Sequence, residues 1–170
     1  MMKNWMLILT ALLSIFILAA CGKSLEEQID TGIESAKATF EGEIQEPNTT
    51  VGKINVFLPS GYTIEESEDE SNYLLKKDGK EFILFVNENE GKDSKLLYDL
   101  FKENTGKEII KEETIENEEE FGFTAVLKND ENSYELIVNS GGVKVSTLSD
   151  GHNIDSKLEE MMQIARSVNL

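Results

Sequence analysis

The chain has 170 residues with 33 acidic and 16 basic side chains, and its formal net charge is −17. A surface this negative repels phosphate backbones, which excludes nucleic acid as a partner. The single cysteine and the single histidine exclude a disulfide framework and argue against a zinc enzyme, because zinc sites combine several Cys or His ligands.

The first twenty residues have the layout of a secretion signal. Lys3 supplies a positive charge, an apolar run extends from Trp5 to Ala20, and small residues precede Cys21. The tetrad Leu18-Ala19-Ala20-Cys21 resembles the lipobox of bacterial lipoproteins. That resemblance implies cleavage between Ala20 and Cys21, a diacylglycerol on the Cys21 sulfur, and an acyl group such as palmitate on its new amino group. Cys21 is therefore the predicted lipidation site.

An uncleaved transmembrane helix is the alternative for this segment, because about sixteen apolar-biased residues approach the roughly 17 to 25 that cross a bilayer. Two or three acyl chains on one cysteine make a stable anchor, since each buried CH₂ contributes about 0.8 kcal/mol. We expect a lipid anchor on the extracytoplasmic face of the cell membrane. Abundant Lys, Glu, Asn and Ile with few Pro and Arg residues indicate a Gram-positive source.

Cleavage before Cys21 leaves 150 residues, and because Lys3 is lost the mature chain has 15 basic against 33 acidic residues, a formal charge of −18. This length suits one domain and a tether. The Cys21 sulfur is consumed by the lipid, so we expect neither a disulfide nor a catalytic thiol, and stability must come from packing. We predict the boundaries 1–20 for the signal peptide, 21–50 for the anchor and tether helix, and 51–170 for the globular domain.

An amphipathic helix is predicted after Ser24. Ser24 and Glu27 have the spacing of a capping box, in which the hydroxyl and the carboxylate each accept from the backbone of the other residue. Apolar residues then recur every three or four positions up to Ile44, and Pro47 follows. This stripe either packs on the domain or serves as a stalk or partner-binding helix. Residues 46–52 should form a short linker.

Two runs of β-strands are predicted, separated by one helix. The strands are short, rich in branched and aromatic residues, and bounded by turn residues. The expected strands are 53–58, 62–66, 73–77 and 81–87, then 108–116, 121–128, 133–139 and 143–148. The intervening helix spans 95–104, and a last helix follows Asn153, with Ser156 and Glu159 as a second capping box.

This order predicts an α+β fold, in which a mid-chain and a C-terminal helix pack on an antiparallel sheet of about six to eight strands. The run from Ile54 to Tyr62, with its Pro-Ser-Gly turn, and the final segment Ile164-Ala165-Arg166-Ser167-Val168 resemble PsbP-like α/β/α sandwich domains and uncharacterised Gram-positive lipoprotein domains. The resemblance implies an accessory or binding role. It assigns no functional residue.

Candidate chemistry is sparse. A Ser-His-Asp triad could be built only around His152, and its neighbours are turn formers, so we interpret it as a solvated loop residue. Two acidic runs, 65–70 and 116–120, could attract Ca²⁺, but such runs are usually solvated surface. The segment 87–91 has its glycine at the wrong place for a calcium loop. We predict no catalytic residue, no metal site and no cofactor.

The aromatic residues of the predicted strands are expected in the core, although a ligand cleft lined by Tyr62 and Tyr73 is an alternative. Our leading hypothesis is a non-enzymatic, membrane-tethered module that binds another envelope protein, as an exclusion or immunity lipoprotein does. A small-ligand or cation-binding lipoprotein is the second hypothesis. A hydrolase with dispersed carboxylates comes third, because nothing in the sequence selects a pair of acids.

Overall fold

The computed structural model describes residues 23–169. In this part of the chain, three helices accompany a seven-stranded sheet and a two-stranded sheet. The elements are α2 (Leu25–Glu41), β1 (Thr49–Val51), β2 (Ile54–Val56), β3 (Thr63–Glu66), β4 (Asn72–Lys77), β5 (Lys80–Val86), α3 (Leu96–Asn104), β6 (Ile109–Glu116), β7 (Phe121–Asp130), β8 (Ser133–Ser140), β9 (Val143–Ser149) and α4 (Ile154–Ser167).

The large sheet consists of two antiparallel meanders joined edge to edge. Its strand order is β3-β4-β5-β9-β8-β7-β6, and every neighbouring pair is antiparallel. The meanders meet where β5 pairs with β9, with Phe82 opposite Thr147. The predicted α+β class, the antiparallel sheet and the two helices packed on it are confirmed.

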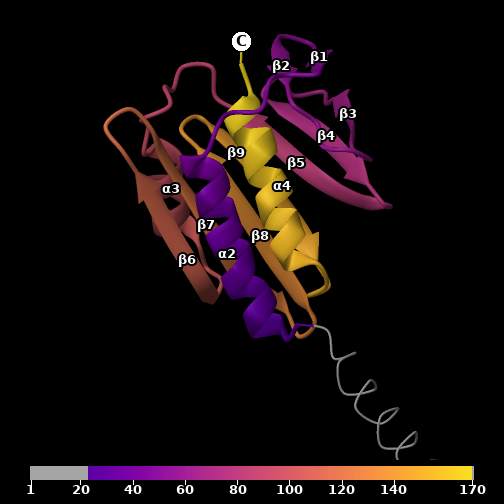
Figure 1. Ribbon diagram of the computed structural model, residues 1–170, viewed down its shortest axis with the longest axis vertical. Coiled ribbons are helices and arrows are strands. Elements are labelled where there is room, and N and C mark those ends of the chain that lie inside the picture. The colour runs from indigo at the N-terminus through magenta and orange to yellow at the C-terminus, as the bar shows by residue number, and fades with distance from the viewer. Residues whose placement is uncertain (1–22, 170) are drawn as a thin grey trace, which may run out of the picture.

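The sheet lies between two helical layers. Helices α2 and α4 cover one face, and α3 lies on the other (Figure 1). Strand β7 shows the division most clearly, since Phe121, Phe123, Ala125 and Leu127 pack beneath α3 whereas Val126 belongs to the core under α2 and α4. The alternation along one strand thus supplies apolar side chains to both layers.

The predicted apolar stripe of α2 packs against the domain. Ile29, Ile33 and Phe40 are buried in the main core, where burial of each side chain is worth roughly 1.5 to 3 kcal/mol. Gly32 sets how closely α2 approaches α4, because a Cβ there would lie 2.9 Å from Leu158 Cδ1 and 3.0 Å from the Cα of Asp155. Helix α2 therefore belongs to the same core as the rest of the fold and is not a free stalk.

An arginine from α4 holds the C-terminal end of α2. Arg166 donates to the carbonyl oxygens of Thr39 and Gly42 at 2.8 and 2.9 Å, and to the Glu120 carboxylate at 2.9 Å. Its guanidinium also lies over the Phe40 ring, 5.0 Å from the centroid. No basic residue occupies the last turn of α2. Arg166 thus supplies the positive charge that a helix C-terminus favours.

The segment predicted as a linker contains a strand. Thr49–Val51 forms β1 and pairs with β2, with a turn at Gly52, whose φ is +52°. The Asn48 side chain extends this pairing, because it donates to the Leu58 carbonyl at 3.0 Å and accepts from the Leu58 amide at 2.9 Å. A three-residue strand between turn-forming residues is too short to show a period-2 pattern, so the sequence does not reveal it.

The second predicted capping box is wrong. Helix α4 begins at Ile154, two residues before Ser156, and its N-cap Asn153 is left-handed, with φ 54° and no side-chain cap. The amide of Ile154 instead donates to Gln28 Oε1 at 3.3 Å. A side chain of α2 therefore satisfies the first turn of α4, and this long-range contact replaces the local motif.

Candidate functional site

The predicted lipidation residue Cys21 and the cleavage site after Ala20 lie outside the described residues, so lipidation stays a prediction. The described chain enters α2 almost at once. Glu27 N donates to Ser24 Oγ at 3.2 Å and Ser24 N donates to Glu27 Oε2 at 2.8 Å, which confirms the first capping box. Because an extended residue spans at most about 3.6 Å, Ser24 lies within about 11 Å of Cys21.

We call the end of the molecule where α2 begins the anchor pole, after the lipid anchor predicted on Cys21. This pole gathers the N-terminus of α2, the segment before β6, the turns between β4 and β5 and between β7 and β8, and the loop before α4. In Figure 1 the chain enters α2 at this end, while the C-terminus lies at the opposite end. That opposite end is named the distal pole, and it gathers 41–53, 65–71, 87–95, 116–120 and 166–169.

Charge is distributed unequally between the two poles. The described segments of the distal pole carry 15 acidic and four basic residues. At the anchor pole, the segments 23–27, 77–80, 107–108, 128–132 and 150–157 carry eight acidic and six basic residues. The excess negative charge of the domain is therefore concentrated at the distal pole. Helix α2, which has 17 residues, spans the distance between them and is about 25 Å long.

The predicted acidic runs lie at the distal pole, where basic side chains partly neutralise them. Lys53 pairs with Glu70 at 3.3 Å and with Glu88 at 3.6 Å, and Lys95 pairs with Glu116 at 2.6 Å. The described residues contain no group of three or more His, Cys, Asp or Glu side chains arranged to hold a metal. These acidic runs therefore form solvated surface with ion pairs to neighbouring lysines.

A polar hollow opens at the anchor pole beside the start of α2. Its volume is about 580 Å³, and Lys23, Gln28, Tyr134, Asp150 and Asn153 contribute to its walls. Lys23 Nζ also pairs with Asp155 at 2.6 Å, which joins the first described residue to the first turn of α4. The hollow therefore lies directly beside the point where the chain enters the domain.

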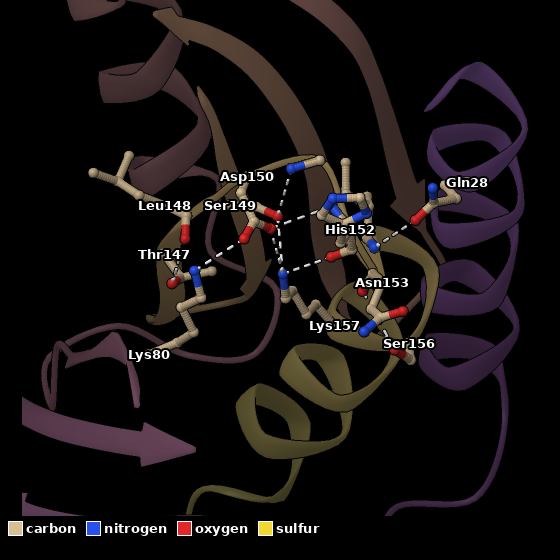
Figure 2. A network of polar contacts seen from close by, with 12 residues as sticks. Gln28, Lys80, Thr147, Leu148, Ser149, Asp150, His152, Asn153, Ser156 and Lys157 are labelled. Carbon is tan, nitrogen blue, oxygen red and sulfur yellow. Dashed lines mark hydrogen bonds and ion pairs between the residues drawn. The ribbon is translucent and has the colours of Figure 1, made fainter. Parts of the chain in front are cut away.

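A lysine network organises the loop that leads into α4 (Figure 2). Lys157 Nζ donates to Ser149 Oγ at 2.9 Å and to the His152 carbonyl at 2.6 Å, while Asp150 Oδ2 accepts from Lys80 at 3.1 Å. The bond from Lys80 and the backbone bond from His152 lower the pKa of Asp150 to about 2. Burial, in contrast, lowers the pKa of Lys157. Sequence reasoning missed Lys157, because a lysine in an amphipathic helix carries no signal of its tertiary environment.

His152 lies in this loop and is exposed, in agreement with its interpretation as a solvated loop residue. Its main chain is fixed at both ends, because its amide donates to Asp150 Oδ1 at 3.3 Å and its carbonyl accepts from Lys157. The hydroxyl of Ser149 accepts from Gly151 N and from Lys157. These bonds give the segment a role in positioning the start of α4.

The proposed aromatic cleft does not form. Tyr62 and Tyr73 are both buried, as expected of core residues, but Tyr62 lines a hollow beside α4 and Tyr73 lines another beside the distal acidic run. Phe82, Phe121 and Phe123 are buried as predicted. The two tyrosines therefore do not line a common site, and only Tyr62 lies beside the lysine network.

No helix among residues 23–169 is long and apolar enough to span a membrane. Comparison with known proteins gives no assignment, because no family model and no curated protein matches the chain.

Proposed function

We propose that this chain is a lipoprotein of the cell envelope, anchored through lipid on Cys21, whose domain is a non-enzymatic interaction or accessory module. The observation that supports this proposal best is the position of α2. The helix begins four residues after Cys21 and is built into the core, so a lipid on Cys21 would hold the anchor pole against the membrane. The domain would then have one fixed orientation.

The charge distribution is consistent with that orientation. An anionic membrane surface repels acidic groups within about one Debye length, which is about 8 Å at physiological ionic strength. The anchor pole, with nearly balanced charge, can approach such a surface. The distal pole, about 25 Å away along α2, lies beyond its reach. The reversed orientation would press the most acidic segments of the chain onto the membrane.

A partner approaching from outside the membrane meets the distal pole first. Its 15 acidic residues against four basic ones favour a partner with a basic surface, through faster encounter and complementary charge. An exclusion or immunity protein, which blocks an incoming protein at the cell surface, would use such a surface. The yield of crosslinks to a basic partner, whether an envelope protein or an incoming protein, should fall as the salt concentration rises, because salt screens the attraction.

The lipid anchor is tested with Cys21→Ser. This variant should keep the fold but lose palmitate labelling and membrane retention, because the sulfur that carries the lipid is removed. Cell fractionation with metabolic labelling measures both. Undiminished membrane retention of Cys21→Ser would defeat the anchor and favour the uncleaved helix.

The orientation is tested separately with one dye at each pole. Asn132→Cys places a thiol at the anchor pole and Glu118→Cys places one at the distal pole, and both positions are exposed. Headgroup-level quenchers should quench a dye on the Asn132→Cys variant several-fold more than a dye on the Glu118→Cys variant. Equal quenching in a labelled, lipidated protein would reject the fixed orientation while leaving the lipid anchor intact.

The interaction role is tested by in-cell crosslinking of the wild-type and Cys21→Ser proteins, followed by mass spectrometry. Capture of one envelope protein by the anchored form alone supports the role. Absence of any specific capture contradicts it and favours the ligand-binding hypothesis.

A further inference from the structure

A small hollow lies between the β4–β5 hairpin and the N-terminal half of α4. Its volume is about 190 Å³, and its walls include Tyr62, Phe82, Lys77, Lys157 and Glu160. The hollow lies next to the network of Figure 2, because Lys157 and Asp150 belong to both. This volume accommodates a carboxylate or phosphate group with a few further atoms.

A buried hydroxyl without a partner lines the hollow. Tyr62 is 8% exposed, and its ring meets Phe82 edge-on at 5.2 Å, but its hydroxyl has no hydrogen-bond partner. Burial first and the Glu160 carboxylate second raise the pKa of Tyr62. The Glu160 carboxylate lies beside this hydroxyl, and its two oxygens accept from Lys77 Nζ at 2.7 and 2.8 Å. Leaving such a group unpaired costs about 1 to 3 kcal/mol, which a ligand can recover.

One ammonium group of the hollow, that of Lys157, has only a long contact with a carboxylate. Lys77 is neutralised by Glu160, and Lys80 by Asp150. Lys157 has only neutral hydrogen-bond acceptors, and its nearest carboxylate oxygen, on Asp150, is 3.9 Å away. Asp78 lies at the rim in an exposed turn. Two carboxylates of the hollow, Glu160 and Asp150, are therefore paired with Lys77 and Lys80, and Lys157 is the ammonium least neutralised.

The N-terminus of α4 adds to this preference. The helix has 14 residues, and Asn153 and Ser156 both line the hollow, while Gln28 and Asp155 accept from the amides of Ile154 and Ser156. Backbone N–H groups and the positive end of a helix favour an anion. A buried hydroxyl without a hydrogen-bond partner, and an ammonium whose nearest carboxylate oxygen is 3.9 Å away, thus lie beside the end of α4 that attracts negative charge.

We propose that this hollow binds the anionic head of a small ligand, a carboxylate or phosphate group, with Lys157 as its charge partner and the Tyr62 hydroxyl as a further donor. The site does not depend on the lipid anchor. Its position near the anchor pole makes two sources of the anion accessible, a soluble molecule and the phosphate of a lipid headgroup.

The test measures thermal stability of the purified full chain in dodecyl maltoside, in sodium phosphate, sodium acetate or sodium chloride at equal ionic strength. Phosphate or acetate should raise the Tm more than chloride does, and the concentration dependence gives an apparent affinity. Lys157→Met should weaken that affinity at least about tenfold and Tyr62→Phe about fivefold. Lys144→Met, a lysine on the opposite face of the sheet, is the matched control and should change nothing.

Tyr62→Phe removes only the hydroxyl and keeps the ring, so it keeps the test valid if Lys157→Met does not fold. Far-UV circular dichroism checks the fold of both variants. Phosphate and acetate effects equal to that of chloride in the wild type would overturn the proposal. An anion effect that persists unchanged in both Lys157→Met and Tyr62→Phe would overturn it as well.

A second arm separates the two sources of the anion. Monomeric dihexanoyl phosphatidic acid is added to the same samples. Binding at least tenfold tighter than that of inorganic phosphate, and lost in Lys157→Met but kept in Lys144→Met, supports the lipid headgroup. Binding of phosphate or acetate without binding of this lipid supports a soluble ligand. The site is contradicted if the lipid binds Lys157→Met as tightly as the wild type and neither phosphate nor acetate binds.

Discussion

The two faces of the large sheet are closed in different ways. On one face, α2 and α4 bury a continuous core that includes Phe40, Leu158 and Met162. On the other face, the nine-residue α3 covers a smaller cluster around Phe123, and Ile83 and Leu148 remain exposed. This difference indicates that the stability of the domain is carried mainly by the α2–α4 face, and that α2 is essential to the fold.

The largest expected effect separates two phenylalanines. Phe40 is fully buried against Gly122 and beneath Arg166, so Phe40→Ala should lower the free energy of unfolding by about 3 to 5 kcal/mol. Phe101 is half-buried on the α3 face, so Phe101→Ala should lower the free energy of unfolding by only about 1 to 2 kcal/mol. Urea denaturation followed by circular dichroism measures both. Equal losses would contradict the unequal closure of the two faces.

The next effect concerns the arginine that joins α4 to α2. Arg166→Met removes the donors to the carbonyl groups of Thr39 and Gly42 at the C-terminal end of α2. It also leaves the Glu120 carboxylate, whose side chain is 13% exposed, paired only with Lys92 at 3.4 Å. We expect a loss of about 2 to 3 kcal/mol in urea denaturation. Replacing both residues, as Arg166→Met with Glu120→Gln, should recover part of it. A double variant less stable than Arg166→Met would contradict the pairing.

A smaller effect is expected at the close approach of α2 and α4. Ala has a higher helix propensity than Gly by about 1 kcal/mol, but a Cβ at position 32 would press on Leu158 and on the backbone of Asp155. Gly32→Ala should therefore lower the unfolding free energy by about 1 kcal/mol. Gly106→Ala, where a Cβ meets nothing within 4 Å, is the control and should be neutral. Stabilisation by Gly32→Ala would show that the two helices can separate at little cost.

The smallest effect belongs to an ion pair outside both cores. The pKa of Asp150 is held at about 2, below its ordinary 3.8, so the unfolded chain takes up a proton at this residue before the folded chain does. The contribution of the ionised Asp150 side chain to the free energy of unfolding is present above about pH 4 and is lost as the pH falls toward 2. Asp150→Asn should lower stability slightly at pH 6, since Asp150 is half-exposed, and the difference should vanish near pH 2. Urea midpoints measured at pH 2, 3, 4 and 6 check this. A difference that grows toward pH 2 would be contrary to the assigned sign.

Most of the fold can be predicted from the sequence, because its elements are encoded locally. The four-residue recurrence from Leu25 onward and the capping box at Ser24 define α2, and hairpin turns such as Asp78-Gly79 separate the strands. Where a long-range contact replaces a local motif, prediction fails. The cap of α4 comes from Gln28 on another helix, and β1 exists because it pairs with β2.

The candidate sites are less predictable for the same reason. The hollow beside Tyr62 draws side chains from the loop before β3, from β4, from β5 and from α4, and each of them resembles an ordinary core or surface residue in the sequence. The charge difference between the poles also needs the antiparallel topology, which brings turns far apart in the sequence to the same end. In contrast, the lipobox is contiguous and is recognised from the sequence alone.

The packing of α2 on α4 also has a kinetic consequence. Helix α2 completes its core only with α4, and Arg166 of α4 fixes the contact. Pairing two helices so far apart in the sequence requires closure of a long loop, which slows folding. A chain exported through the membrane as proposed would stay unfolded, and able to thread through a translocation channel, until its final helix has emerged.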